Sequence, residues 1–221
     1  MRIPPNGLNR ERTRVLLVDD HAIVRSGFRR LLAEYPDIDV VGEAETGEQG
    51  YRAFVECRPD IVVLDISMPD TSGLALMQRL FAREPDARVI IFSMHDDAAM
   101  AERALAIGAR GYVTKSSAPD VLVRAILDVA AGRLFLSADI AHAVARARFA
   151  GAPDPLRELS TREFEIFRQL VAGRAPADIA RALNLSAKTI ANYHTQIKQK
   201  LGVATDIELM RIALRQDLVE R

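Results

Sequence analysis

Short aliphatic runs alternate with amphipathic stretches over the first 130 residues of the chain. The aliphatic runs lie at residues 15–18, 40–41 with their flanks, 61–64 and 89–92, with a weaker fifth run at 111–113. The helical patterns lie near residues 22–34, 46–57, 72–84, 96–107 and 118–131. Strands that are apolar throughout and alternate with helices are typical of a parallel sheet covered on both faces. With right-handed crossovers, this pattern predicts an α/β fold built on a doubly wound, five-stranded parallel sheet.

The second part of the chain has a different pattern, because no clear strand signal follows Gly132. Residues 133–155 combine an Ala- and Arg-rich stretch with Gly and Pro, which predicts a linker that is partly helical around 137–148. Four helical segments follow, and the first opens with a capping box formed by Ser160 and Glu163. We therefore expect two domains, at residues 14–132 and 156–221, the second being an all-α domain of four helices.

The composition narrows the class of protein. Hydrophobic residues make up 49% and charged residues 27% of the chain, which excludes disordered, collagen-like and disulfide-rich proteins. The single cysteine cannot form an intramolecular disulfide, and no aliphatic run approaches the ~18 residues of a membrane helix, so we expect a cytoplasmic protein with no membrane partner. The net charge is zero, yet residues 156–221 carry 11 basic and 8 acidic side chains while the first 155 carry 19 and 22. The two halves are therefore expected to meet different partners.

Four of the predicted strands end beside side chains that can carry chemistry: Asp19 and Asp20, Asp65, Ser93, and Lys115. The carboxyl ends of parallel strands lie along one edge of a sheet, so these side chains should share a pocket. Three carboxylates repel one another and require a cation, and their oxygen donors favour Mg²⁺. A lysine and a hydroxyl beside them can hold the oxygens of a phosphoryl group. Taken singly, each residue could equally be an ordinary solvated or capping side chain.

Segments 15–21, 63–69, 92–93 and 111–115 (VLLVDDH, VLDISMP, FS and GYVTK) resemble, in order and spacing, the receiver domain of bacterial response regulators. The resemblance covers about residues 14–132 and implies a flavodoxin-like fold. It implies that Asp65 accepts a phosphoryl group from a sensor histidine kinase. It also implies that Mg²⁺ is bound by Asp20, Asp65 and the main-chain carbonyl of Ser67, with Asp19 acting through a bound water.

The same resemblance assigns a switching role to three further residues. Lys115 would pair with the phosphoryl oxygens, Ser93 would turn inward to hydrogen-bond one of them, and Tyr112 would swing inward behind it. An acyl phosphate adds roughly −1.5 to −2 charges and three strong acceptors. A few charge-assisted hydrogen bonds, each worth roughly 1.5–3 kcal/mol, supply the ~5.5 kcal/mol that inverts a 1:99 equilibrium. We expect the face from helix 96–107 to helix 118–131 to change shape.

Segments 159–166, 178–183, 185–192 and 200–203 resemble the LuxR-type helix-turn-helix. Combined with the receiver, this resemblance identifies the chain as a member of the NarL/FixJ-type response regulators. The sequence departs from the family pattern at Ala175-Pro176-Ala177, where relatives have a Ser cap followed by a polar or basic residue. Ala191 stands where relatives often carry Lys, which predicts weaker or differently specified contact with the groove.

The third helix of the second domain, near residues 187–201, carries the predicted DNA contacts. Ile190, Ile197 and Leu201 recur at helical spacing and should face the core, with Tyr193 beside them. The opposite face can read adenine with Asn and thymine methyls with Ala and Thr, while lysines contact phosphates. His194 could either pack or contact a phosphate. The residues predicted to contact double-stranded DNA are Lys188, Thr189, Ala191, Asn192, Thr195, Lys198 and Lys200.

These features together predict a transcription regulator that is not an enzyme, is phosphorylated on Asp65, and binds promoter half-sites as a homodimer. One alternative is an aspartyl-phosphate hydrolase of the haloacid-dehalogenase type, but that chemistry requires an acid two residues after the nucleophile, where this chain has Ser67. Another is a regulator controlled by ligand or protein binding, which the intact pocket argues against. His21 and His95 could instead indicate a transition-metal site, and the polar face of helix 187–201 could be merely solvated.

Overall fold

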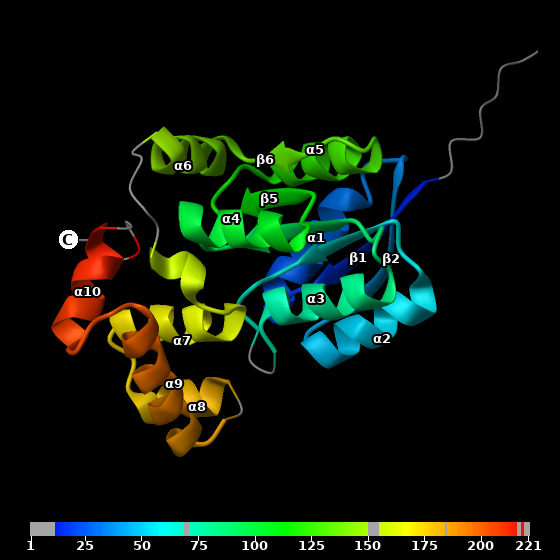
Figure 1. Ribbon diagram of the computed structural model, residues 1–221. Coiled ribbons are helices and arrows are strands. Elements are labelled where there is room, and N and C mark those ends of the chain that lie inside the picture. The colour runs from blue at the N-terminus through cyan, green and yellow to red at the C-terminus, as the bar shows by residue number, and fades with distance from the viewer. Residues whose placement is uncertain (1–11, 69–70, 150–154, 184, 216–217, 219–221) are drawn as a thin grey trace, which may run out of the picture.

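The computed structural model describes residues 12–68, 71–149, 155–183, 185–215 and 218. Its first domain contains a six-stranded parallel sheet in the order β2-β1-β3-β4-β5-β6 (Figure 1). The strands are β1 (Thr13–Val18), β2 (Ile38–Ala44), β3 (Ile61–Leu64), β4 (Val89–Ser93), β5 (Gly111–Thr114) and β6 (Phe135–Leu136). The five predicted strands and the doubly wound parallel arrangement are confirmed.

Five helices cover the two faces of the sheet: α1 (Ala22–Leu32), α2 (Gly47–Cys57), α3 (Gly73–Arg83), α4 (Ala98–Ile107) and α5 (Pro119–Ala130). Neighbouring residues of a strand point to opposite faces, so each buried strand contributes to two cores. In β1, Val15 and Leu17 pack with α1 and α5, whereas Leu16 and Val18 pack with α2, α3 and α4. This alternation explains why the strands read as continuous apolar runs in the sequence.

The prediction of only five strands was wrong, because β6 lies in the stretch expected to be a linker. Two residues are too short to show a strand periodicity, and β6 is held by backbone pairing with β5. The helix expected around 137–148 is confirmed as α6 (Ala138–Phe149), which packs against α4 through buried Ile140 and Val144. The hydroxyl of Thr114 donates to Asp139 of α6 at 2.6 Å, so α6 anchors the end of β5.

The second domain consists of a short 3-10 helix, η1 (Pro155–Glu158), followed by α7 (Thr161–Val171), α8 (Pro176–Ala182), α9 (Ala187–Lys200) and α10 (Asp206–Arg215). The predicted capping box of α7 is present, since Ser160 accepts from the Glu163 N–H and Glu163 accepts from the Ser160 N–H. Ala175 provides no side-chain cap for α8, as its sequence predicted. Among the described residues, no helix combines the length and apolar character needed to cross a bilayer.

The turn after β3 depends on the absence of a side chain at Gly73. A Cβ built at this position would lie 2.0 Å from the main-chain oxygen of Asp65. We expect Gly73→Ala to lower the free energy of unfolding by about 1–3 kcal/mol in urea denaturation, as overpacking does. Gly27→Ala is the control, because a Cβ there meets nothing within 4 Å and α1 should gain about 0.5–1 kcal/mol. Equal stability of the two variants would contradict this account of the turn.

Candidate functional site

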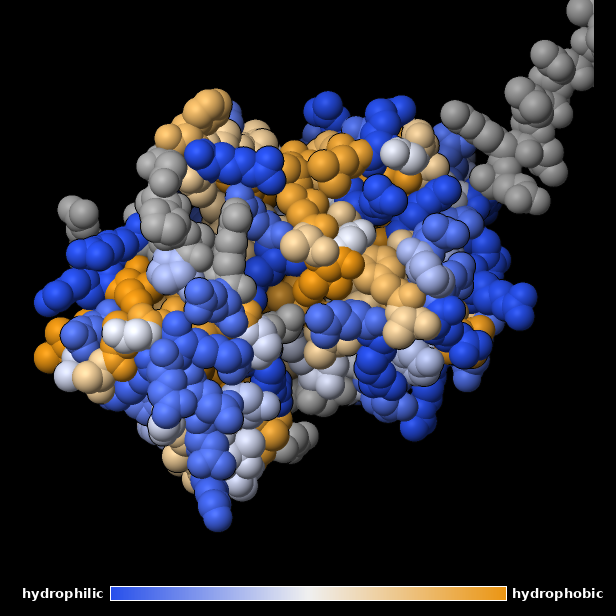
Figure 2. Space-filling view, viewed as in Figure 1, coloured by the Kyte–Doolittle hydropathy of each residue, from blue (hydrophilic) through white to orange (hydrophobic). Residues whose placement is uncertain are grey.

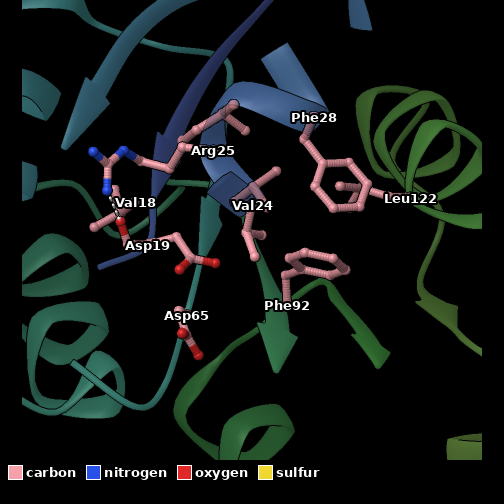
Figure 3. Close-up of a pocket in the computed structure, with 10 residues that line it drawn as sticks. Val18, Asp19, Val24, Arg25, Phe28, Asp65, Phe92 and Leu122 are labelled. Carbon is pink, nitrogen blue, oxygen red and sulfur yellow. Dashed lines mark hydrogen bonds between the residues drawn. The ribbon is translucent and has the colours of Figure 1, made fainter. Parts of the chain in front are cut away.

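The carboxyl ends of β1, β3 and β5 bring three of the predicted site residues into contact. Asp19 and Asp65 directly follow β1 and β3 (Figure 3). They are 5% and 2% exposed. The Lys115 ammonium, just beyond β5, lies 2.6 Å from Asp19 Oδ2 and 2.6 Å from Asp65 Oδ2. The sheet ladder continues to these residues, since the Asp65 N–H donates to the Val18 carbonyl at 2.8 Å. The juxtaposition inferred from strand topology is thus present in the structure.

The carboxylates leave oxygen atoms that suit a hard cation. Single ligand atoms of Asp19, Asp20, His21 and Asp65 all lie within 4.8 Å of one another. Asp19 Oδ2 and Asp20 Oδ1 are both buried; Lys115 Nζ lies 2.6 Å from the first and His21 Nδ1 lies 2.8 Å from the second. A single ammonium is shared by Asp19 and Asp65, and buried carboxylates are costly unless cations balance their charge. The donor set, dominated by carboxylate oxygen, therefore fits Mg²⁺.

His21, which the sequence indicated only as one half of a possible transition-metal site, belongs to this acidic cluster. Its Nδ1 lies 2.8 Å from Asp20 Oδ1 and 3.1 Å from Asp19 Oδ1, and 58% of the side chain is exposed. The available signal was its position directly after the Asp pair. The second histidine of the proposed transition-metal site, His95, is not a member of the cluster. The structure therefore does not support that alternative.

The environment of Asp65 makes its carboxylate unusually basic. Burial raises the pKa of Asp65, and the charge of Asp19 adds to this effect. The hydrogen bond and charge of Lys115, and the N–H of Ser67 at 3.1 Å, act in the opposite direction. An apolar wall of Val24, Phe92 and neighbouring side chains lies beside the two carboxylates (Figure 3). A partly dry, basic carboxylate next to a fixed ammonium can act as a nucleophile toward an electrophilic, anionic group.

Two residues with predicted switching roles are already buried in this structure. Ser93 is fully buried and its hydroxyl oxygen accepts from the His95 N–H at 3.2 Å. Tyr112 is also fully buried, and its hydroxyl donates to the His95 carbonyl at 2.9 Å. Tyr112 thus already occupies the inward position in this structure, where the main chain of the β4–α4 loop accepts its hydroxyl hydrogen bond. Burial raises the pKa of Tyr112 well above its ordinary value, so it stays protonated.

The side chain of His95 connects the site to the second domain, and the sequence reasoning missed this role. Its Nε2 lies 3.0 Å from the Ser67 hydroxyl oxygen, and its Nδ1 lies 2.8 Å from the Arg168 guanidinium of α7. Burial, followed by the positive charges of Arg168 and Lys115, lowers the pKa of His95 to about 3. The ring is therefore neutral at physiological pH.

Helix α9 presents the predicted polar face to solvent. Ile190 and Ile197 are fully buried, and Leu201 and Tyr193 pack against the same core. Figure 2 shows hydrophilic side chains over α8 and α9. The exposed residues among the predicted DNA contacts are Lys188, Ala191, Asn192, Thr195 and Lys200. Thr189 is half-buried, and its hydroxyl lies 2.8 Å from that of Ser186, the N-cap of the helix.

Two of the lysines predicted to contact phosphates are engaged within the domain. Lys198 lies 2.7 Å from Asp206 of α10, and Lys200 lies 2.6 Å from Glu163 of α7. The prediction counted charges along α9 and did not consider which neighbouring helices supply carboxylates. His194 neither packs in the core nor stands free, because its Nε2 also contacts Asp206 at 2.7 Å. Lys188 is the exposed lysine of α9 without an ion pair among the described residues.

Comparisons with known proteins agree with both halves of this geometry. Residues 15–127 match the response regulator receiver domain, and residues 157–213 match the bacterial regulatory proteins of the luxR family. The chain is 40% identical over 197 residues to the transcriptional regulatory protein UhpA of Escherichia coli (strain K12), covering 89% of this chain and 95% of that protein. It is 34% identical over 206 residues to the response regulator UvrY of the same organism, covering 92% and 94%.

The fold is similar to a solved structure of RcsB from Salmonella enterica serovar Typhimurium, with a TM-score of 0.69 between the two chains. That RcsB is bound to a promoter in the presence of phosphomimetic BeF3−. The two chains are 27% identical, and the match covers 91% of this chain and 98% of RcsB. Each of the three matches spans both halves of this chain and nearly the whole length of the relative. The chain belongs to the NarL/FixJ family of two-component response regulators, with a receiver domain followed by a LuxR-type DNA-binding domain.

Proposed function

We propose that a sensor histidine kinase phosphorylates this regulator on Asp65 in a Mg²⁺-dependent reaction, and that phosphorylation switches dimerisation and DNA binding to control transcription. The observation that carries the proposal is the buried carboxylate of Asp65, 2.6 Å from Lys115 and beside Asp19. In the reaction, an Asp65 oxygen forms a bond to phosphorus. The bond between phosphorus and the donor breaks, and its electron pair leaves with the donor group.

Bound Mg²⁺ would be held by Asp20, Asp65 and the Ser67 carbonyl, with Asp19 acting through a water, and would neutralise charge on the carboxylates and phosphoryl oxygens. The protein itself supplies the remaining groups. Lys115 is positioned to pair with a phosphoryl oxygen, and Ser93 can exchange its hydrogen bond with the His95 N–H for one to the phosphoryl group. That exchange would alter the β4–α4 loop, which also holds Tyr112.

The DNA-bound form is proposed to be a homodimer on paired half-sites in the cytoplasm. A single helix in the major groove reads only a few base pairs, so two copies supply the length of a specific site. RcsB, the structural neighbour, has been solved as dimers bound to DNA. The exposed face of α9 has the chemistry for this contact, with Asn192 flanked by Lys188 and Thr195.

The proposal is tested by incubating the full chain with acetyl phosphate, with Mg²⁺ or with EDTA. Intact mass should increase by one phosphoryl group with Mg²⁺, and the increase should be lost with EDTA. Binding to DNA sites selected from a random pool should tighten, and the sedimentation coefficient should increase, on phosphorylation. A chain that gains no phosphoryl group, or whose DNA affinity does not respond to it, would refute the proposed switch.

The roles of Asn192, Lys188 and Lys198 in DNA binding can be separated by substitution. Asn192→Ala is expected to relax sequence preference at one base pair and cost about 1–3 kcal/mol on the specific site. Lys188→Ala should weaken binding to all sequences and lower the salt slope of binding by about 1. Lys198→Ala is the matched control, because its ammonium is paired with Asp206, and it should leave the salt slope nearly unchanged. Fluorescence anisotropy against salt measures all three, and equal slopes for the two lysine variants would contradict this assignment.

A further inference from the structure

Two arginines join the domains at the β4–α4 side of the receiver, where α7 lies beside α3 and α4 (Figure 1). Arg168 of α7 contacts His95 Nδ1 at 2.8 Å and lies 3.6 Å from Asp97, the N-cap of α4. In the opposite direction, Arg103 of α4 donates to the Leu159 carbonyl at 2.7 Å and stacks 4.1 Å from the centre of the Phe164 ring. A side chain of the DNA-binding domain is thus separated from the turn after Asp65 by a single imidazole.

The contact between Arg168 and His95 determines which ring nitrogen carries the proton. A guanidinium has five N–H donors and no acceptor, so His95 Nδ1 must accept the hydrogen bond. A neutral imidazole has one N–H, which must then be on Nε2. Nε2 lies 3.0 Å from the Ser67 hydroxyl oxygen, so that oxygen accepts from His95. The hydroxyl proton of Ser67 is left free to donate to another group.

Ser67 belongs to the turn that carries the predicted phosphoacceptor, since its N–H donates to Asp65 Oδ1 at 3.1 Å. We propose that Arg168 is a positioning residue for phosphoryl transfer to Asp65. It holds His95 in the Nε2–H form, and the Ser67 hydroxyl can then donate to an oxygen of the incoming phosphoryl group. This inference rests on the proposed function, because it assigns a role within the same transfer. An Asp65 oxygen forms the bond to phosphorus, and the bond between phosphorus and the donor group breaks. Ser67 neither gains nor loses a proton in this step.

Loss of Arg168 reverses the direction of the chain of hydrogen bonds. The ring can then carry its proton on Nδ1, and Nε2 accepts the Ser67 proton and withdraws it from the phosphoryl site. Docking of α7 therefore changes the hydrogen bonds available at Asp65, and where the Ser67 bond persists to the phosphoryl group on Asp65, phosphorylation strengthens docking by linkage. The DNA-reading residues Lys188 and Asn192 are exposed while α7 is docked, so this coupling does not depend on covering α9.

The test uses the full chain with Arg168→Met, which removes the donors and keeps an extended side chain, and Arg168→Lys, which restores a donor. The first readout is ¹⁵N NMR of the four histidine rings, with His95 assigned by its absence in His95→Gln. The second is the rate of phosphoryl uptake from acetyl phosphate with Mg²⁺. We expect the Nε2–H form in the wild type, a mixture in Arg168→Met, and an uptake rate that falls about three- to tenfold, the effect of one hydrogen bond. Arg168→Lys should recover most of the rate.

Two further variants distinguish positioning from domain docking alone. In a Ser67→Ala background, Arg168→Met should have no additional effect on uptake. Arg162→Met is the control on the same helix, because Arg162 contacts Glu165 and the Leu183 carbonyl within its own domain, and its uptake should match the wild type. An equal effect of Arg168→Met in both backgrounds, or an Nδ1–H ring in the wild type, overturns the positioning role. If the wild type has His95 in the Nε2–H form and still takes up no phosphoryl group, both the proposed function and the positioning role of Arg168 are refuted.

Discussion

Asp65→Asn is expected to reduce phosphoryl uptake to below about 1% of the wild-type rate while leaving the fold intact. An amide oxygen is a poor nucleophile, and the remaining carboxylates, Asp19 and Asp20, follow a different strand. Burial raises the pKa of Asp65, so its charged form is disfavoured in the folded chain relative to the unfolded chain. Removing that charge should leave the free energy of unfolding at pH 7 unchanged or slightly raised. Intact-mass kinetics and urea denaturation measure the two effects separately.

Asp96→Asn provides the matched control for this substitution. Asp96 is an exposed carboxylate in the β4–α4 loop, at the same edge of the sheet, and it is outside the acidic cluster. Its replacement should leave the uptake rate within about twofold of the wild type, since exposed surface substitutions rarely perturb a structure. If Asp65→Asn still takes up a phosphoryl group at the wild-type rate, the acceptor lies elsewhere. If Asp65→Asn unfolds, the carboxylate of Asp65 stabilises the fold, contrary to the expectation from its raised pKa.

The pocket could be predicted from the sequence because its geometry follows from chain topology. Asp19, Asp65 and Lys115 each lie just beyond a parallel strand, and strand order alone brings them to one edge. The same argument could not find β6, whose two residues show no periodicity and are held by partners on β5. Nor could it place Lys198 and Lys200, because their carboxylate partners come from α10 and α7. Local pattern determines the ends of elements, whereas side-chain pairing depends on how elements pack.

The contact between the domains was also beyond sequence reasoning, for a related reason. Arg168 and His95 are 73 residues apart, and neither residue type at its position indicates the other. Both belong to amphipathic or loop segments whose apolar pattern is satisfied without the contact. Once the structure shows that Arg168 contacts His95, however, the chemistry of arginine, which can only donate hydrogen bonds, determines which nitrogen of the His95 ring carries the proton. The structure thereby adds a chemical link between α7 and Asp65 to a pocket that topology had already predicted.

Lys115 is a buried cation that pairs with two carboxylates of the pocket. Its side chain is 6% exposed, and its ammonium lies 2.6 Å from both Asp19 and Asp65. Two buried carboxylates that share one ammonium are stable only while that ammonium is present. Removing one partner of a buried ion pair leaves an uncompensated charge and costs about 3–5 kcal/mol.

We therefore expect Lys115→Met to lower the free energy of unfolding by about 3–5 kcal/mol at pH 8 in EDTA. The loss of the Lys115 hydrogen bond and charge should raise the pKa of Asp65 further, because both now lower it. A folded-state pKa above the unfolded one means that stability is present at low pH and is lost as the pH rises through the folded value. The deficit of the variant should thus shrink from pH 8 to pH 5, and Mg²⁺ should reduce it at pH 8 by supplying the missing cation. Urea denaturation from pH 5 to pH 8 measures the effect, with substitution of the exposed Lys188 (Lys188→Met) as the control. A stability deficit that depends on neither pH nor Mg²⁺ would show that Lys115 stabilises the domain by packing rather than by charge.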